Sequence, residues 1–353
     1  MSRVESYTSA DSASRGRTAL ETDSINAIKA WSVVGGLWLA FVVYIMVKWA
    51  LSDSFKPTPP GDDPMSTYTR YAVVVSQTLV PLLWLVVAHH FLVKPWRRVR
   101  EIRVEGLVFI AWTTGSFQDP LMSYTVNNLA YNAHLMNFGA WTAGIFPGWT
   151  APNSQLIAEP VLIIFWSWAL FAIPATMLVC TAMRAMVRRF PSLGLPGAIF
   201  AAFLVLAMWD LIGETAFIRS GLCSYPGSIQ SLSLWGGHYY QFPLYESATL
   251  GLALTMTTLL LYFRNDRGET WVERGIGQLK ANRPTKELMR LLAVIGFVNV
   301  AIMFCWTIPM QWIGTHADPY PDDLPSYLQK SSFCGPGTGY ECPGPKVAMP
   351  RRN

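Results

Sequence analysis

Charged residues are scarce in this sequence: Asp, Glu, Lys and Arg make up 14% of 353 residues, and hydrophobic residues make up 52%. A soluble protein carries roughly 25% charged residues because its surface faces water. The deficit excludes an ordinary soluble globular protein. The length would allow two domains. A bundle of about seven membrane helices with its loops also uses this much chain, so we expect one all-α membrane domain.

Cysteine is also rare, with five residues and no CxxC pair, which excludes a thioredoxin-type redox site and a zinc ribbon. Cys180 and Cys305 fall singly within apolar stretches, whereas a membrane thiol oxidoreductase needs paired cysteines near the outer face. Cys334 and Cys342 lie eight residues apart in the C-terminal tail. If that tail is in an oxidising compartment, they are predicted to form a disulfide, with Cys223 as a competing partner.

Other absences exclude further classes. The last apolar stretch, 289–312, has no lysine for a retinal Schiff base, and no internal repeat supports an inverted-repeat transporter. The net charge of +5 comes from short basic blocks between apolar stretches, without an aromatic-interleaved basic stripe, so no nucleic-acid partner is expected. His134, His238 and His316 share neither a helix nor a ligand spacing, so neither a metal nor another cofactor is expected.

Long apolar stretches dominate the rest of the chain. A membrane-spanning helix needs about 20 apolar residues. Stretches of this kind occur at 30–51, 71–93, 105–124, 158–182, 196–218, 244–263 and 289–312. We therefore predict about seven transmembrane helices within a domain at 27–313.

The two ends of the chain differ in composition from this domain. Residues 1–26 are polar and rich in Ser and Thr, which predicts a disordered cytoplasmic tail. Residues 314–353 are rich in Pro and Gly and are predicted to form an extracytoplasmic tail.

The basic residues predict the orientation. With the N-terminus inside, 19 of the 27 Lys and Arg residues fall on the cytoplasmic side and 7 on the other, with Lys48 at the outer end of the first span. Because basic residues resist translocation, the chain is predicted to be N-in and C-out. We expect it in the plasma membrane, with the lipid bilayer as its surroundings.

The outer segments 125–157 and 219–243 are long, aromatic and nearly free of charge. Such segments are too apolar to stand in water, so we predict that they fold back over the bundle as a cap. A belt of aromatic residues at the membrane interface is the alternative interpretation.

Carboxylates interrupt the apolar stretches. Ionisable groups in a bilayer are costly and usually face a cavity or a partner. Asp119, Asp210, Glu214 and Glu246 all fall in the outer half of the predicted bundle, and Asp210 and Glu214 share one helical face at i, i+4 spacing. We expect Asp119, Asp210 and Glu214 to line one cavity.

Clustered carboxyl groups in an apolar cavity have a clear chemical use. Burial and mutual repulsion keep one of them protonated as a general acid, while an ionised neighbour stabilises a developing cation. Asp210 or Glu214 is the expected donor and Asp119 the expected ionised partner. In the alternative interpretation, Arg219 neutralises Glu214 and the carboxylates serve only helix packing.

Several further residues are predicted to bind the substrate or support the acids, through aromatic faces that stabilise a cation or through polar groups near the cavity. These are Gln118, Tyr124, Trp209, Arg219, His238, Tyr240, Glu246 and Trp306.

Four segments carry a family resemblance: SFQDPL at 116–121, NNLAYN at 127–132, WDLIGE at 209–214 and HADPYP at 316–321. With these, the chain resembles actinobacterial multi-pass membrane proteins of the AveC-like spirocyclase family, over about 105–325. The resemblance implies spiroketal formation in polyketide maturation, a secondary-metabolite pathway, in which two hydroxyls add to one ketone with loss of water. A lipophilic, polyketide-like substrate is then expected.

Two other functions stay open beside this cyclase. A membrane terpene cyclase would use the same carboxylates to protonate an epoxide or alkene. A non-catalytic lipid-binding or transport protein would use them only for packing or gating.

Overall fold

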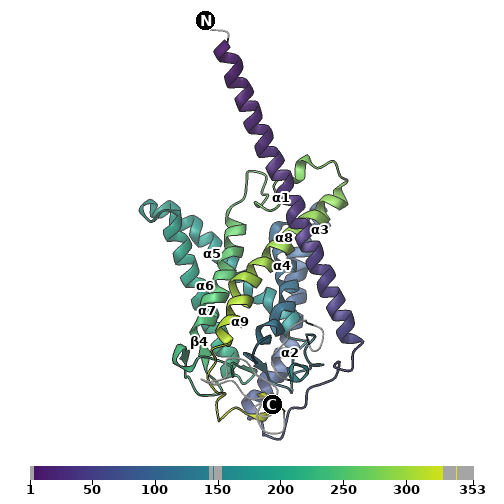
Figure 1. Ribbon diagram of the computed structural model, residues 1–353, viewed down its shortest axis with the longest axis vertical. Helices are drawn as coiled ribbons and strands as arrows, with labels where there is room; N and C mark the ends of the chain where they lie inside the picture. The colour runs from purple at the N-terminus through teal and green to yellow at the C-terminus, as the bar shows by residue number, and fades with distance from the viewer. Residues whose placement is uncertain (1–3, 143–145, 147–152, 329–338, 340–353) are drawn as a thin grey trace.

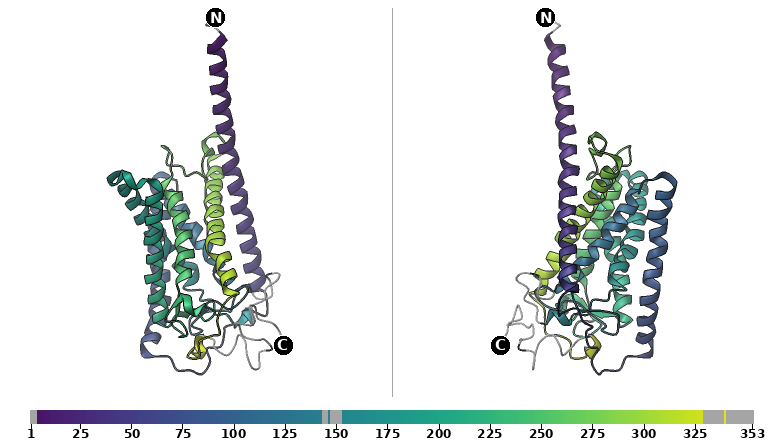
Figure 2. Two further views of the ribbon diagram at one scale, coloured as in Figure 1. Left: turned by 60° about the vertical axis from the view of Figure 1, so that its left-hand side comes forward. Right: turned by 90° about the vertical axis from the view of Figure 1, so that its right-hand side faces the viewer.

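Long helices that run side by side make up most of the protein (Figures 1 and 2). The computed structural model describes residues 4–142, 146, 153–328 and 339. Its α-helices are α1 (Val4–Ala50), α2 (Thr67–Ala88), α3 (Lys94–Val99), α4 (Val104–Gly115), α5 (Ile164–Arg189), α6 (Gly194–Arg219), α7 (Leu244–Tyr262), α8 (Arg283–Ile302) and α9 (Ile308–Gly314).

Shorter elements join or extend these helices. Two wide π-helical turns, η1 (His89–Val93) and η7 (Met303–Thr307), connect α2 to α3 and α8 to α9. The 3₁₀ segments are η2 (Ser116–Ser123), η3 (Ser154–Leu156), η4 (Pro191–Leu193), η5 (Gln230–Leu232), η6 (Ile276–Gln278) and η8 (Ser326–Leu328). The strands are β1 (Ala130–Tyr131), β2 (Cys223–Ser224), β3 (Ser233–Leu234) and β4 (Phe242–Pro243).

Six helical segments in the described part of the chain are long and apolar enough to cross a membrane. They are Asn26–Ala50, Thr67–Val99, Ile164–Arg189, Pro191–Arg219, Leu244–Tyr262 and Arg283–Gly314. Each coincides with a stretch predicted from hydropathy. The chain is therefore a mostly helical, multi-pass membrane protein.

The remaining predicted span, 105–124, is built differently. It is a 12-residue α-helix, α4, continued by the 8-residue 3₁₀ helix η2. A 3₁₀ helix rises about 2.0 Å per residue against 1.5 Å in an α-helix, so together the two reach about 34 Å, close to the hydrocarbon thickness of about 30 Å. Pro120 falls inside η2. The count of seven spanning helices stays a prediction.

The segment predicted at 158–182 is displaced along the chain, because α5 begins only at Ile164. Residues 157–160 are buried but not helical, Pro160 forms a β-bridge with Asn137, and a turn at 161–163 leads into the helix. Hydropathy alone does not distinguish a buried extended segment from the start of a helix.

The N-terminal segment, predicted as a disordered tail, precedes the first candidate membrane span. The structure continues α1 back to Val4, and Figure 1 shows this part projecting beyond the other helices. A spanning helix already supplies the costly first turn, and each further residue then adds one hydrogen bond. The predicted domain limits near residues 26 and 314 stay predictions.

Helices α1 and α8 pack closely along each other. Glycines make the close approach possible: a Cβ atom at Gly296 would lie 2.6 Å from the carbonyl oxygen of Trp31, and a Cβ at Gly35 would collide with the Leu292 carbonyl. Small residues at helix crossings are a general device in membranes, where van der Waals contact replaces the hydrophobic effect.

The two aromatic segments predicted to lie outside meet each other. β1 pairs antiparallel with β2, with Tyr131 opposite Cys223, and β3 pairs with β4. Much of the segment 127–142 is buried, including Trp141. Chain regions more than 90 residues apart are thus joined at the end of the bundle where α9 and the described C-terminal part also lie (Figure 1).

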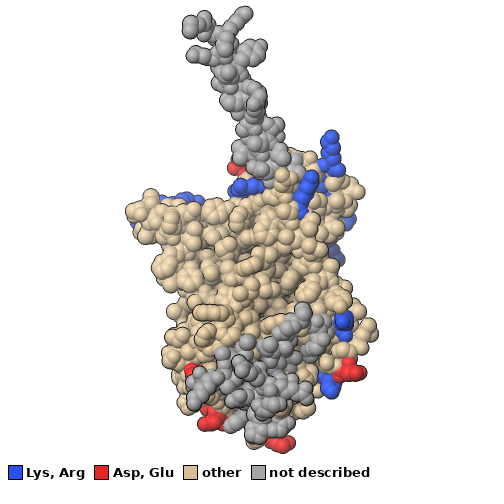
Figure 3. Space-filling model, viewed as in Figure 1, with Lys and Arg blue, Asp and Glu red and all other residues tan. Residues whose placement is uncertain are grey.

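Charge is distributed unevenly along the bundle. Figure 3 shows a broad band without Lys, Arg, Asp or Glu, with basic residues gathered at the end nearest the projecting part of α1. The two basic segments near 94–104 and 264–290 meet at one pocket. This distribution agrees with the predicted N-in orientation, which itself stays a prediction.

Candidate functional site

A cavity of about 160 Å³ lies among α4, η2, α5, α6, α7 and η7, close to the β1–β2 pair. Its wall is mainly aromatic and aliphatic, and three carboxyl groups line it. These are Asp119 from η2, Glu214 from α6 and Glu246 from the first turn of α7. Three acids far apart in the sequence thus share one largely apolar space.

Asp119 is held by donors. The Tyr131 hydroxyl donates to the two carboxylate oxygens at 3.0 Å, and Trp168 Nε1 donates to Oδ2 at 3.1 Å. The residue is 3% exposed. Burial, and then the charge of Asp119, raise the pKa of Tyr131 well above its ordinary value, so the phenol keeps its proton. These donors favour the ionised form of Asp119, which its burial disfavours.

The Glu246 and Asp210 carboxyl groups lie close enough to interact with each other. Asp210 Oδ1 and Glu246 Oε2 have no hydrogen-bond partner in the described residues. Their second oxygens accept from Ser247 Oγ at 2.9 Å and from Trp306 Nε1 at 2.9 Å. Two carboxyl groups hydrogen-bond to each other only when one of them carries a proton. A proton shared by this pair would lie beside the cavity, which Glu246 lines and Asp210 does not.

Glu214 lines the same cavity, one helical turn from Asp210. The Tyr225 hydroxyl donates to its Oε2 at 3.3 Å. In the described part of the chain, no Lys or Arg side chain pairs with any of these four acids. Their charge is therefore governed by protons and neutral donors.

Arg219 does not neutralise Glu214. Its guanidinium lies over the rings of Trp235, at 4.6 Å, and Tyr240, at 4.2 Å. His238 stacks on Tyr240 and pairs with exposed Asp323 at 3.0 Å. Arg219, His238 and Tyr240 thus form a cluster on the surface and are not brought to the cavity. The sequence predicts how far along the bundle axis these residues lie, but it does not predict the direction in which their side chains point.

Three other predicted supporting residues also lie away from the cavity wall. Trp209 is 39% exposed and packs on Phe171, because it is rotated about 100° from Asp210 on the same helix. Gln118 is buried in a polar contact between helices, donating to Asn299 and accepting from Thr307. Tyr124 follows η2 and is partly buried. Of the predicted supporting residues, Glu246 and Trp306 do line the cavity.

Glu159 is a buried acid that was not among the site residues predicted from the sequence. It precedes α5, is 1% exposed, and its Oε2 has no partner in the described residues. Burial, and then the Asp119 charge, raise the pKa of Glu159 well above its ordinary value. A carboxylate next to Pro160 in an apolar stretch could have indicated a buried acid, but Glu159 lies at the edge of a predicted span.

Cys334 and Cys342 lie outside the described residues, and Cys223 is buried with a free thiol. Among the described residues, no group of three or more His, Cys, Asp or Glu side chains is arranged to hold a metal ion.

A family model described as "Spirocyclase AveC-like" matches residues 96–329, more than half of the chain. The chain belongs to the AveC-like spirocyclase family. The matched range includes all the cavity acids and both outer segments. Comparison with curated proteins and with solved structures gives no match.

Membership of the AveC-like spirocyclase family supports a cyclase role for the chain. The match covers α4, where the cavity begins, and continues through α9 and η8. It leaves out α1 and α2. Every residue that lines the cavity lies between Trp112 and Trp306, so the matched part of the chain contains the whole cavity lining.

Proposed function

We propose that the protein is a membrane-embedded, acid-catalysed cyclase that forms a spiroketal from a lipophilic dihydroxyketone. One observation carries the proposal: Asp119, Glu214 and Glu246 share an aromatic-walled cavity in which no basic side chain of the described residues neutralises them. Such a cavity can hold one acid protonated and another ionised, as a ketal-forming reaction requires.

The proposed reaction proceeds through a hemiketal. One substrate hydroxyl adds to the ketone, and Glu246, backed by Asp210, protonates the hemiketal hydroxyl, which leaves as water. The resulting oxocarbenium ion is stabilised by the Asp119 carboxylate and by the rings of Trp168 and Trp306. The second hydroxyl attacks this cation and releases its proton, which restores the acid.

Geometry supplies a second contribution. The volume of about 160 Å³ is below the 300–1,000 Å³ typical of pockets that enclose a whole drug-sized ligand. It holds the reacting segment of a long substrate, folded into one cyclisation geometry, while the remainder extends toward lipid. Such positioning lowers the entropy cost of ring closure. Glu214 is proposed to hold a substrate hydroxyl.

A direct test uses a symmetric dihydroxyketone whose two arms close into six-membered rings. This probe also cyclises slowly without an enzyme, so the readout is the handedness of the spiro centre, measured by chiral chromatography. The purified protein is expected to give one hand in excess. Glu246→Gln and Asp119→Asn are expected to abolish that excess, while the exposed variant Asp323→Asn retains it.

The outcomes separate the candidate functions. A racemic product at the uncatalysed rate, from folded protein, would refute spiroketal formation on this substrate class. Turnover of an epoxide-bearing polyprene instead would assign the cavity to terpene cyclisation. A tightly retained lipid without turnover of either probe would favour the lipid-binding alternative.

The orientation is proposed as N-in, in the plasma membrane, with the outer segments as a cap over the cavity. A periplasm-active reporter fused after Gly314 is expected to be active, and one fused after Arg189 inactive. The reverse pattern would overturn the orientation without affecting the chemistry.

A further inference from the structure

A second, larger pocket lies at the other end of the bundle, where the basic segments meet. Its volume is about 950 Å³, and it is bounded by η1, α3, α4, α5, the segment between α7 and α8, and the start of α8. The resemblance to the AveC-like spirocyclase family implies nothing about this pocket. Its position opposite the acid cavity separates it from the proposed reaction.

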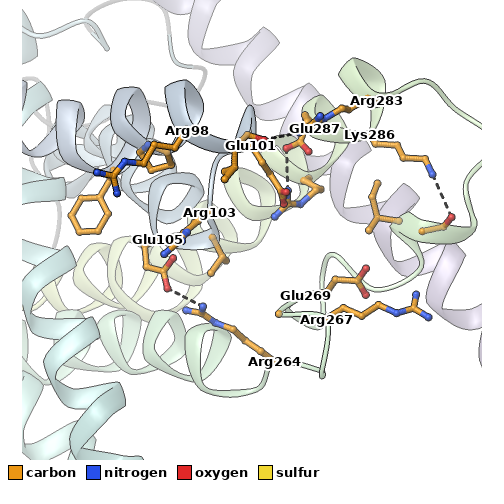
Figure 4. Close-up of a pocket in the computed structure, with 18 of the residues that line it drawn as sticks. Arg98, Glu101, Arg103, Glu105, Arg264, Arg267, Glu269, Arg283, Lys286 and Glu287 are labelled. Atoms are coloured by element: carbon orange, nitrogen blue, oxygen red, sulfur yellow. Dashed lines mark hydrogen bonds and ion pairs between the residues drawn. The ribbon is translucent and has the colours of Figure 1, made fainter.

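Ion pairs build a fixed frame around this pocket. Arg264 Nη1 contacts Glu105 Oε1 at 2.8 Å, and Arg290 contacts Glu101, Glu273 and Glu287 at 2.8–3.0 Å. Figure 4 shows Glu101 and Glu287 converging while Arg264 reaches across to Glu105. These contacts join the α3–α4 region to the α7–α8 region, so the pocket does not depend on a ligand to form.

Three arginines on the pocket wall are left without such a partner. Within the described residues, Arg98, Arg103 and Arg267 form neither an ion pair nor a side-chain hydrogen bond, and all three are exposed. Arg98 and Arg103 come from one side of the pocket and Arg267 from the other (Figure 4). The Arg98 and Arg267 side chains extend in opposite directions (Figure 4), so the wall offers unpaired positive charge on both of its sides, and a bound anion would reduce the repulsion between these charges.

The wall is not basic throughout. Phe91, Val104, Met177 and Ile276 also line the pocket. Met177 lies near the middle of α5, about 12 residues and thus about 18 Å from the helix end at Arg189. The pocket therefore extends from a charged rim to the apolar depth of the bundle. A ligand matching both parts has an anionic head and an apolar tail.

We propose that this pocket binds the phosphate group of an anionic phospholipid, held by Arg98, Arg103 and Arg267. Guanidinium groups suit phosphate because they donate two parallel hydrogen bonds to its oxygens. Basic pockets between membrane helices are a common form of lipid headgroup site. Arg283 and Lys286 are less available, because they donate to backbone carbonyls of Arg100 and Gly277.

The test compares two sets of three charge removals in the full-length, detergent-solubilised protein. The pocket set is Arg98→Gln, Arg103→Gln and Arg267→Gln. The control set is Arg188→Gln, Arg189→Gln and Arg274→Gln, which are exposed basic residues outside the pocket lining. The probes are phosphatidylglycerol in phosphatidylcholine micelles, and inorganic pyrophosphate.

Phosphatidylglycerol is expected to raise the melting temperature saturably and to survive on the protein in native mass spectrometry. The pocket set is expected to weaken this binding about tenfold or more, because it removes charge-assisted hydrogen bonds to the phosphate. The control set is expected to retain it. Because the pocket-set arginines form neither an ion pair nor a side-chain hydrogen bond within the described residues, the unliganded melting temperature should change little.

Other results would identify the source of the bound phosphate group or contradict the proposed site. Saturable binding of pyrophosphate alone, lost in the pocket set, supports the phosphate site but assigns it to a soluble ligand. Equal weakening in both sets would show general attraction to anionic surfaces and overturn the proposal. Binding of neither probe would overturn it as well. All of these readouts are independent of cyclase activity.

Discussion

The two ends of this bundle treat carboxyl groups in opposite ways. Around the basic pocket, Glu101, Glu105, Glu273 and Glu287 each meet an arginine. Around the acid cavity, the carboxyl groups meet hydroxyls, indole N–H groups or each other. The first arrangement fixes charge permanently and serves architecture. The second leaves the charge to be set by protons, which is what acid catalysis requires.

The largest expected effect is at Asp119. Asp119→Asn removes the anion that is proposed to stabilise the oxocarbenium ion, and turnover is expected to fall about 10²–10⁴-fold. KM should change little, because the amide keeps the shape of the side chain. Steady-state kinetics on the dihydroxyketone measures both constants, with Asp323→Asn as the matched control. Retained turnover in a folded variant would remove Asp119 from the mechanism.

Arg290 tests the contribution of the ion pairs at the basic end of the bundle. Arg290→Met leaves the fully buried Glu273 without its cation, and is expected to cost about 3–5 kcal/mol of stability. Adding Glu273→Gln should recover part of that loss, because the uncompensated charge is then gone. Denaturation in detergent micelles compares the single and double variants. A double variant no more stable than the single one would contradict the ion-pair explanation.

A smaller effect, of opposite sign, is expected at Glu159. Its raised pKa means that the folded protein favours the neutral acid, so its contribution falls as pH rises above the ordinary carboxyl range toward the raised value. Glu159→Gln keeps the neutral form at every pH. At alkaline pH the variant should be more stable than the parent by roughly 1–3 kcal/mol, the scale of an unsatisfied buried group.

The measurement for Glu159 is a pair of stability curves against pH. The two proteins should agree at acidic pH and separate as pH rises. Parallel curves over the whole range would show that Glu159 is not the titrating group.

The smallest effect is expected on the surface. His238 and Asp323 form an ion pair in which both side chains are about half exposed, and such pairs contribute less than about 1 kcal/mol. Asp323→Asn should therefore change the melting temperature only slightly, and that small change should shrink further in high salt. A loss of stability as large as that of Arg290→Met would show that this surface cluster contributes substantially to the stability of the fold.

The sequence located the acids of the site better than their surroundings. Hydropathy placed Asp119, Asp210, Glu214 and Glu246 within apolar stretches at similar height, and the structure brings three of them to one cavity. Height follows from counting residues along a helix. Rotation about the helix axis depends on which neighbour each helix packs against, and this is not in the local pattern.

Particular residues show where that limit lies. Gln118 and Asp119 are adjacent, yet Gln118 contacts Asn299 while Asp119 faces the cavity, because adjacent side chains on the 3₁₀ helix η2 point about 120° apart. Tyr131, the main donor to Asp119, arrives from an extended segment whose position depends on pairing with residues about 90 positions later. Long-range pairing of two-residue strands leaves no periodic signal. The chemical roles of these residues stay predictions.

The wide turn η7 has a consequence for how the last helical segment is interpreted. A π turn contains one more residue than its hydrogen-bonding pattern would need in an α-helix, so the faces of α9 are rotated by about 100° relative to those of α8. Pro309 follows closely after η7, as Pro95 follows η1, and the wider turn relieves the clash that a proline causes with the preceding turn. The inserted residue directs Trp306 to Glu246 and lets Gln311 reach Thr125 and the Leu121 carbonyl. Deleting one residue from Met303–Thr307 would therefore act as a phase shift: it would leave hydropathy almost unchanged and turn every later contact of the helix away from its partner.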